Sequence, residues 1–391
     1  MKILFLSTGH SIDDDRVGRK EAVSLARLGY EVIVCAQYNN RYLEPRVKFI
    51  DIDSVKYVDA ETPLKKKRLG RISRCIRLRN LFRSYQKVKP DLVVAHEFES
   101  ACLARWIYTH YGTPYVFDVH EAYEETIPRI VPKIFRPMIR ILVRKEIKRI
   151  VRDASGITAA VPKVLAYQEA IRINKHSEIL YNSPWLEYFP FSEIEKETIL
   201  IVQEGNLSID RGAFQILDAL AIVKRRYKFK LVVIGSVVSD IAKKFYNRIA
   251  ELSLEDYIEI KGFLPWDEFG QIEKDAQIGL CCLQQTHNCT ISLACKIFTY
   301  SSCGLAIVGM KESETENYIC DAQNGICVDT TNPDEISNAI IWLIEHPEER
   351  RQMARNGRKA IEERYCWERM EERIRKFYKQ LFFELSKKRC S

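Results

Sequence analysis

The chain has 391 residues, of which 46% are hydrophobic and 29% charged. At roughly 150 residues per domain this length predicts two domains, and the composition excludes a disordered or fibrous protein. The net charge of +8 is uneven: residues 1–190 carry 33 basic and 22 acidic side chains, and residues 191–391 carry 28 and 31. We therefore expect only the first half to face an anionic partner.

No targeting segment is evident, because the apolar run in Met1–Ser7 is too short for a signal peptide and no later run approaches ~18 apolar residues. We therefore expect a cytoplasmic protein. Its twelve cysteines are scattered and include no C-x-x-C pair. We expect small buried thiols, with neither disulfides nor a metal site.

Short apolar runs predict strands in the first half: Lys2–Ser7, Glu31–Ala36, Asp91–Ala95 and Pro114–Val119. Helical patterns lie between them, one ending at Gly29 and another over Ala101–Tyr111. Continuous Val and Ile runs that alternate with helices are typical of a parallel sheet covered on both faces. The first half is therefore predicted to be α/β and doubly wound.

The same alternation begins again in the second half. The expected strands are Thr198–Gln203, Leu231–Ile234, Ile258–Lys261, Ile278–Leu283, Leu305–Val308 and Gly325–Val328, and the expected helices are Gly212–Tyr227, Asp240–Leu252 and the region after Glu348. The stretch Tyr181–Glu197 is aperiodic and contains two prolines. We predict domains over residues 1–182 and 198–366, a linker over 183–197 and a last helix over 367–391, with a ligand in the cleft between the two sheets.

Two segments concentrate the positive charge. Leu64–Lys89 holds eleven basic and no acidic residues, and Arg129–Arg152 holds nine basic residues and one Glu. In the first segment, an apolar helix face is bordered by Arg71, Arg74 and Arg77, which suits an anionic membrane surface. The alternative is a solvated helix face. Nucleic acid is not expected, because no recognition module accompanies the charge.

Several motifs, taken in order, carry a family resemblance. They are Asp14-Asp15-Arg16-Val17 followed by Lys20-Glu21-Ala22, then Ala95-His96-Glu97, Asp118-Val119-His120-Glu121, Glu204 to Gly212, Val233-Ile234-Gly235-Ser236, Ile260 to Leu264, Lys296 to Gly304, and His346 to Glu368. Together they resemble family-4 retaining glycosyltransferases of the GT-B fold over nearly the whole chain. No P-loop, H-E-x-x-H, G-x-S-x-G or G-x-G-x-x-G pattern competes with that resemblance.

The resemblance implies two Rossmann-like domains that face each other across a cleft, and a C-terminal helix that crosses back to the first domain. It also assigns site residues. The catalytic set is His120, Arg211 and Lys296; the donor-binding set is Gly205, Asn206, Gly235, Ser236, Phe263 and Thr299; the acceptor-side set is Arg16, His96, Glu97 and Glu121.

Each of these residues also has a structural interpretation. Arg211 precedes a helix, where a donor diphosphate would bind, but it is equally a helix-start side chain that opposes the helix dipole. His120 would hydrogen-bond the donor sugar, although a lone His is often structural. Ser236 and Phe263 could be ordinary turn residues, and Arg16 could simply pair with the neighbouring aspartates.

The chain departs from the family pattern at the donor site. Asn206 stands where relatives have an Arg that contacts the diphosphate. Thr299 and Ile291 stand where relatives have the two glutamates of the E-x7-E motif. Thr299 can still form hydrogen bonds, but not charge-assisted ones. These departures bear on donor affinity, and Lys296 is a nearby charge that would compensate.

The resulting expectation is a metal-independent, retaining hexosyltransferase without a cofactor. It would use a nucleotide sugar, with UDP as the nucleotide, and a lipid-linked or surface-polysaccharide acceptor, while the first domain associates with the inner face of the membrane. Two alternatives stay open: a catalytically degenerate relative that serves as a binding or partner subunit, and a GT-B sugar-nucleotide epimerase.

Overall fold

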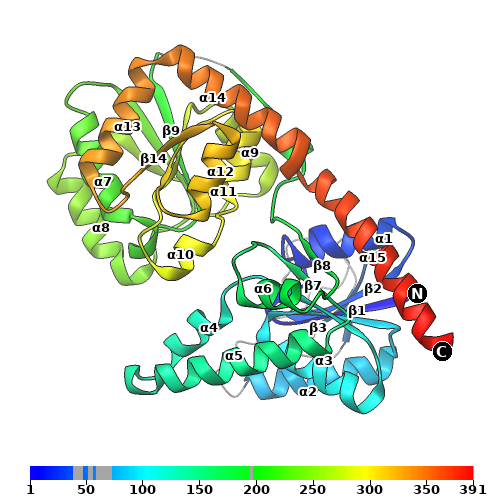
Figure 1. Cartoon of the computed structure of the whole chain (residues 1–391). Coiled ribbons are helices and arrows are strands. Elements are labelled where there is room, and N and C mark those ends of the chain that lie inside the picture. The colour runs from blue at the N-terminus through cyan, green and yellow to red at the C-terminus, as the bar shows by residue number, and fades with distance from the viewer. Residues whose placement is uncertain (38–46, 52–55, 59–72, 194–196, 391) are drawn as a thin grey trace. The chain divides into compact units, whose positions relative to one another are not determined.

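The structure is a computed structural model that describes residues 1–37, 47–51, 56–58, 73–193 and 197–390, without the side chains of 51, 56–58, 73, 74, 267 and 388–390. The chain divides into two units (Figure 1). Unit 1 contains Met1–Asn182 together with Met370–Ser391, and unit 2 contains Ser183–Arg369.

Unit 1 is built on an eight-stranded sheet of order β4-β3-β2-β1-β5-β6-β7-β8. Its strands are β1 Lys2–Ser11, β2 Glu31–Gln37, β3 Lys48–Asp51, β4 Lys56–Val58, β5 Leu92–His96, β6 Tyr115–Val119, β7 Gly156–Ala159 and β8 Ser177–Ile179. Among the described strands of this sheet, only β3 and β4 pair antiparallel. The buried Val, Ile and Leu of β1 and β5 explain their central place, because a strand covered on both faces needs a continuous apolar run.

The helices of unit 1 lie on both faces of this sheet (Figure 1). They are η1 Val17–Glu21, α1 Ala22–Arg27, α2 Ser73–Val88, α3 Glu97–Tyr111, α4 Tyr123–Thr126, η2 Ile127–Ile130, η3 Lys133–Phe135, α5 Arg136–Asp153 and α6 Leu165–Arg172. The sheet order reverses direction between β1 and β5. Ligands of open α/β sheets bind at such a reversal, outside the carboxyl ends of the strands.

Unit 2 repeats the plan with an all-parallel sheet of order β11-β10-β9-β12-β13-β14. Its strands are β9 Ile199–Glu204, β10 Phe229–Ile234, β11 Ile258–Ile260, β12 Ile278–Cys281, β13 Ala306–Met310 and β14 Gly325–Val328. Here the order reverses between β9 and β12. The predicted fold class of two doubly wound, Rossmann-like sheets is confirmed.

Helices also cover both faces of the second sheet (Figure 1). They are η4 Leu186–Tyr188, η5 Ile209–Arg211, α7 Ala213–Val223, α8 Ser239–Glu251, η6 Glu255–Tyr257, α9 Trp266–Lys274, α10 His287–Ile291, α11 Lys296–Cys303, α12 Glu314–Ala322, α13 Pro333–Glu345, α14 Pro347–Ala360 and η7 Ile361–Tyr365; the last helix of the chain is α15 Trp367–Cys390. Every residue of α11 is buried.

Helix α15 starts in unit 2 and belongs to unit 1 from Met370 onwards. Its apolar side chains at helical spacing are buried, namely Met370, Ile374, Phe377, Tyr378 and Leu381. In unit 1, the Phe377 ring stacks on His176 with ring centroids 4.2 Å apart. The expected return of the last helix to the first domain is therefore present.

Several local expectations need correction. Strands β3, β4, β7 and β8 are missing from the sequence prediction, because strands of three or four residues leave too short an alternation to detect. Helix α3 begins at Glu97 and not at Ala101. The cysteines were expected to be buried thiols, and the eleven described ones are all free, but Cys75, Cys295 and Cys320 are exposed.

Candidate active site

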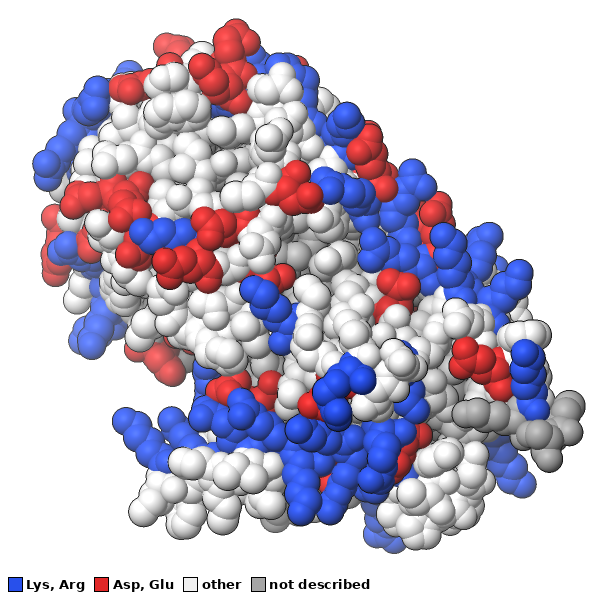
Figure 2. Space-filling view, viewed as in Figure 1, with Lys and Arg blue, Asp and Glu red and all other residues white. Residues whose placement is uncertain are grey.

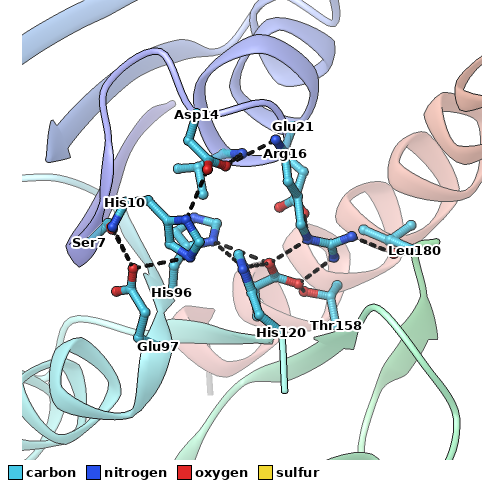
Figure 3. A network of polar contacts seen from close by, with 12 residues as sticks. Ser7, His10, Asp14, Arg16, Glu21, His96, Glu97, His120, Thr158 and Leu180 are labelled. Carbon is cyan, nitrogen blue, oxygen red and sulfur yellow. Dashed lines mark hydrogen bonds and ion pairs between the residues drawn. The ribbon is translucent and has the colours of Figure 1, made fainter. Parts of the chain in front are cut away.

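Polar side chains gather at the sheet reversal of unit 1 (Figure 3). They come from the ends of three neighbouring strands and the loops that follow them: His10 from β1, His96 and Glu97 from β5, and Asp118 and His120 from β6. The reversal thus brings together residues that are far apart in the sequence.

Asp118 is the centre of this cluster and is fully buried. Its carboxylate accepts two hydrogen bonds from Arg16, at 2.7 Å from Nη2 and 3.0 Å from Nε, and one at 2.7 Å from Thr158 Oγ1. Burial alone would raise the pKa of Asp118, but the Arg16 guanidinium and His120 hold it well below its usual range. Asp118 therefore stays ionised.

Arg16 is almost completely buried, and its guanidinium group contacts other groups of the protein. Besides Asp118, it pairs with Glu21 at 2.8 Å and donates to the carbonyl of Leu180. Burial and the charge of Asp118 raise the pKa of Glu21 well above its usual range, although Arg16 opposes this. In this structure Arg16 fixes Asp118, and its predicted contact with an acceptor stays a prediction.

Glu97 organises the loop after β1. Its carboxylate accepts from Ser7 Oγ at 2.5 Å and from the backbone amides of Thr8, Gly9 and His10 at 3.0 to 3.2 Å. Glu97 has a positive φ of 60°, which is uncommon for a non-glycine residue. Its predicted role was acceptor binding, and the structure gives it a loop-building role at the same site.

Three histidines meet beside this loop. His120 Nε2 lies 2.6 Å from Asp118 Oδ2 and 3.2 Å from His96 Nδ1, and the rings of His10 and His120 have centroids 4.7 Å apart. His96 is fully buried, whereas the side chain of His120 is 13% exposed. Of the two predicted histidines, His120 is the one that reaches the surface.

His10 and His120, whose side chains are both partly exposed, carry different charges. Burial lowers the pKa of His120, and the opposing effect of Asp118 does not overcome it, so its ring is neutral at pH 7. Burial also disfavours charge on His10, but the hydrogen bond and charge of Asp14 and the charge of Glu97 outweigh it and raise the pKa of His10 to about 9. A neutral ring able to exchange hydrogen bonds with a hydroxyl group therefore lies against a cationic one.

His96, Asp118 and His120 are the described side chains that could hold a metal ion, because their ligand atoms lie within 4.8 Å of one another. A divalent cation there would compete with the buried Arg16 guanidinium and with Thr158 for the same carboxylate. Two cations on one buried carboxylate repel each other, so the donor set fits a hydrogen-bonded network better than a metal centre.

In unit 2 the corresponding edge is formed by two glycine turns. Gly205 and Gly235 have φ of 86° and 149°, and a Cβ on Gly235 would come within 2.6 Å of the Gly205 carbonyl. The Asn206 side chain accepts from the amide of Ser236 at 2.9 Å. Asn206 thus ties the two turns together at the position where relatives have an arginine.

Arg211 ends the turn before α7 and folds back over Gly205. Its Nη1 donates to the Asn206 carbonyl at 3.0 Å, and a Cβ on Gly205 would lie 2.9 Å from it. Arg211 is exposed. The structure therefore places a cationic side chain beside the glycine turns and the start of α7, where an anion is favoured.

Thr299, on α11, holds a carboxylate from a different strand. Its Oγ1 donates to Glu204 Oε2 at 2.6 Å and lies 3.4 Å from Glu273 Oε1. Burial, together with the charge of Glu204, raises the pKa of Glu273 well above its usual range, so the neutral acid lies beside the Glu204 carboxylate. A carboxylate is thus present next to the position where relatives carry a glutamate.

Lys296 lies one helical turn before Thr299 and is almost completely buried. Burial lowers the pKa of Lys296, and Arg211 acts in the same direction, while Cys281 and Glu204 oppose them. Lys296 thus interacts electrostatically with Glu204 and Arg211, while burial disfavours its positive charge.

The other predicted residues lie at the margins. Phe263 is 68% exposed on the loop after β11, and Glu121 is exposed on the loop after β6. Arg71 lies outside the described residues, and Arg74 is described only in its backbone. Arg77, on α2, is half-buried and donates to the Thr8 carbonyl at 3.3 Å.

Sequence reasoning missed His10, Asp118, Glu204 and Glu273 as site residues. Asp118 had a detectable signal, since a carboxylate in the apolar run Tyr115–Val119 is unusual. Glu204 ends an apolar strand in the same way. His10 and Glu273 gave no such signal, because only the fold brings them to their partners.

Two family models match the chain: Glycosyltransferase Family 4 over residues 19–183 and Glycosyl transferases group 1 over residues 186–360. A curated relative, the uncharacterized glycosyltransferase MJ1178 of Methanocaldococcus jannaschii, is 21% identical over 198 residues. The match covers 49% of this chain and 53% of MJ1178, so the chain spans about half the length of that relative.

Solved structures of other proteins superpose on this fold over nearly their whole length. Sucrose-phosphate synthase from Thermosynechococcus elongatus superposes with a TM-score of 0.78 at 13% identity, covering 98% of this chain and 99% of that one. Anabaena HepE in complex with UDP-glucose gives 0.70 at 15% identity, covering 97% and 100%. These solved structures show the GT-B fold, and the two family models, which follow each other over residues 19–183 and 186–360, show that the chain belongs to the family-4-like glycosyltransferases.

Proposed function

We propose that this protein transfers a hexosyl group from a UDP-sugar to a lipid-linked or surface-polysaccharide acceptor, with retention of configuration and without a metal. The observation that carries the proposal is that each unit has a polar cluster at its own sheet reversal: the glycine turns with Arg211 in unit 2, and the histidine cluster in unit 1. HepE, a structural neighbour, was solved with UDP-glucose.

The donor diphosphate would bind at the glycine turns. Arg211 and the first amides of α7 would offset its charge, and the buried Lys296 would add to the positive potential. Such preorganised charge stabilises a departing diphosphate most where water is excluded. No protein nucleophile is assigned.

Glu204 would replace the missing family glutamate. Its carboxylate is fixed by Thr299 at 2.6 Å and would accept hydrogen bonds from donor hydroxyl groups. In unit 1 the neutral His120 would exchange hydrogen bonds with the sugar. The proposal also places the protein in the cytoplasm, with unit 1 against the inner face of the membrane.

Isothermal titration with UDP and GDP tests the donor assignment. We expect the wild type to bind UDP and Glu204→Gln to bind it about tenfold more weakly, since a charge-assisted hydrogen bond contributes about 1.4 kcal/mol. Glu251→Gln, on the exposed end of α8, is the control and should bind like the wild type.

The outcomes separate the candidate functions. Binding of neither nucleotide contradicts the transferase proposal and favours a partner subunit, an option raised by Asn206 and Thr299. An isomerised donor after incubation without acceptor would identify an epimerase instead. Inversion of configuration at the transferred sugar would contradict the retaining part of the proposal. Dependence of transfer on a divalent ion would contradict the metal-independent part.

A further inference from the structure

Helix α5 and the turn before it expose a row of large apolar side chains. Ile134, Phe135, Met138, Ile141 and Leu142 are between 52% and 82% exposed. Their spacing of three and four residues puts them on one face, opposite Val143, Ile147, Ile150 and Val151, which are buried against unit 1. A contiguous exposed apolar patch on a folded domain indicates a binding surface.

Basic side chains surround this row, which we call the α5 face. Residues 129–152 contain nine Lys or Arg and a single acidic residue, Glu146. Figure 2 shows Lys and Arg gathered over α5, beside an uncharged area at the end where the helix begins. In the described part of the chain, Lys133 and Lys145 form no ion pair, so their charge remains available to an anionic partner.

The neighbouring helix α3 carries partly exposed aromatic rings, of which Trp106 and Tyr111 pack against Phe82 of α2. Arg105 of α3 pairs with Glu146 and Asp153 of α5 at 3.1 and 2.7 Å, which fixes the two helices side by side. Trp106, Tyr108 and Tyr111 on α3 are 39% to 52% exposed. Trp and Tyr with one apolar and one polar end favour the interface between a bilayer and water.

The positive charge of the α5 face distinguishes between a second copy of this chain and an anionic bilayer as its binding partner. A second copy of this chain would place the same cationic face against itself in a two-fold dimer, and like charges would oppose the contact. An anionic bilayer offers both features that the face needs: negative head groups for the Lys and Arg, and acyl chains for the apolar row. Among the described residues, no helix is long and apolar enough to cross a membrane.

We infer that the α5 face docks unit 1 onto an anionic lipid bilayer, with Ile134, Phe135, Met138, Ile141 and Leu142 inserted among the acyl chains. The inference rests on the proposed function, because a lipid-linked acceptor would be met at that surface. The chain runs from His120 through α4 directly into this face, and Arg140 of α5 pairs with Glu125 of α4 at 2.8 Å. Docking therefore places the histidine cluster near the membrane surface.

The experiment is sedimentation of the full chain with vesicles of 70% phosphatidylcholine and 30% phosphatidylglycerol, compared with phosphatidylcholine alone. We expect binding to the anionic vesicles only. The apolar variant Ile134→Gln/Ile141→Gln and the charge variant Lys133→Glu/Lys145→Glu should each weaken partitioning at least tenfold. Circular dichroism checks that the variants remain folded.

Matched controls lie elsewhere on unit 1. Ile171→Gln/Phe383→Gln changes two side chains that are 51% and 59% exposed, and Lys376→Glu/Lys379→Glu changes the net charge by the same amount on α15. Both controls should partition within twofold of the wild type. An equal loss in the controls, or no wild-type binding to anionic vesicles, overturns the inference.

Two further outcomes are separable. If the wild type dimerises without lipid and the α5 variants abolish the dimer, then the face is an interface between copies and the inference is wrong. If vesicle binding holds while neither UDP nor GDP binds, then docking stands and the proposed transferase function fails.

Discussion

At the residue scale, Asp118 determines the architecture of the unit 1 site. One buried carboxylate accepts from an arginine, a threonine and two histidines, so Arg16 balances its charge and the other partners hydrogen-bond its oxygens. Removing one partner from such a buried pair costs about 3–5 kcal/mol, because the other charge is left without compensation. The network therefore keeps His120 in one orientation.

His10 gives the site a pH dependence that can be measured. Its pKa of about 9, raised from 6.5, means that protonated His10 stabilises the fold fully below about pH 6.5 and that this contribution is lost as pH rises through about 9. We expect a contribution on the order of 2 kcal/mol, since the ring is partly exposed. Urea unfolding of His10→Gln and wild type between pH 6 and 10 measures it.

The difference in unfolding free energy between wild type and His10→Gln should shrink as pH rises across that window. His110→Gln, an exposed histidine on α3, is the control and should show no such trend. A constant difference for His10→Gln at all pH values would mean that Asp14 and Glu97 do not hold its proton.

At the element scale, the donor site depends on turns that follow strands. Gly212 has φ of 71° and a Cβ on it would come within 2.4 Å of the Cys282 carbonyl. Strand β12 and the start of α7 therefore approach each other closely only because this position has no side chain. Arg211 and the first amides of α7 owe their placement to that contact.

Two glycines with nearly the same φ allow the cost of backbone strain to be measured separately from the cost of a steric clash. Gly262 has φ of 73°, and a Cβ there would meet nothing within 4 Å. Gly262→Ala should cost about 1–2 kcal/mol for the left-handed backbone alone, while Gly212→Ala should cost at least about 3 kcal/mol. Chemical denaturation measures both, and equal costs would refute the close approach.

At the scale of the whole molecule, the last helix completes a domain that begins at residue 1. Phe377 stacks on His176, and its ring lies 2.7 Å from where a Cβ of Gly156 would be. The edge strand β8 and its neighbour β7 are thus covered by a segment about two hundred residues later in the chain. Unit 1 is not complete without α15.

Phe377→Ala should therefore destabilise unit 1 by about 3–5 kcal/mol, the usual cost of truncating a buried phenylalanine. Hydrogen exchange should accelerate in β7 and β8 and stay unchanged in the strands of unit 2. Phe383→Ala, on the exposed side of the same helix, should cost less than about 0.5 kcal/mol. If the two variants behave alike, α15 does not support that sheet edge.

The sequence by itself determined the fold class, the alternation of strands and helices, and the family motifs. Apolar runs such as those of β1 and β9 are local signals, because a strand that is buried on both faces needs apolar residues at nearly every position. The places of His120 after β6 and of Arg211 before α7 were likewise predictable, because the motifs that contain them are contiguous in the sequence. The strands β7 and β8 were too short to leave a comparable pattern.

Only the tertiary structure decided which side chains act together. Asp118 meets Arg16 across 102 positions, and Thr299 meets Glu204 across 95, and no spacing rule in the chain encodes either pair. The sequence showed the family glutamate as missing, while the fold supplied a carboxylate beside the same position. Contacts of this kind follow from strand order, because the carboxyl ends of neighbouring parallel strands meet at one edge of the sheet.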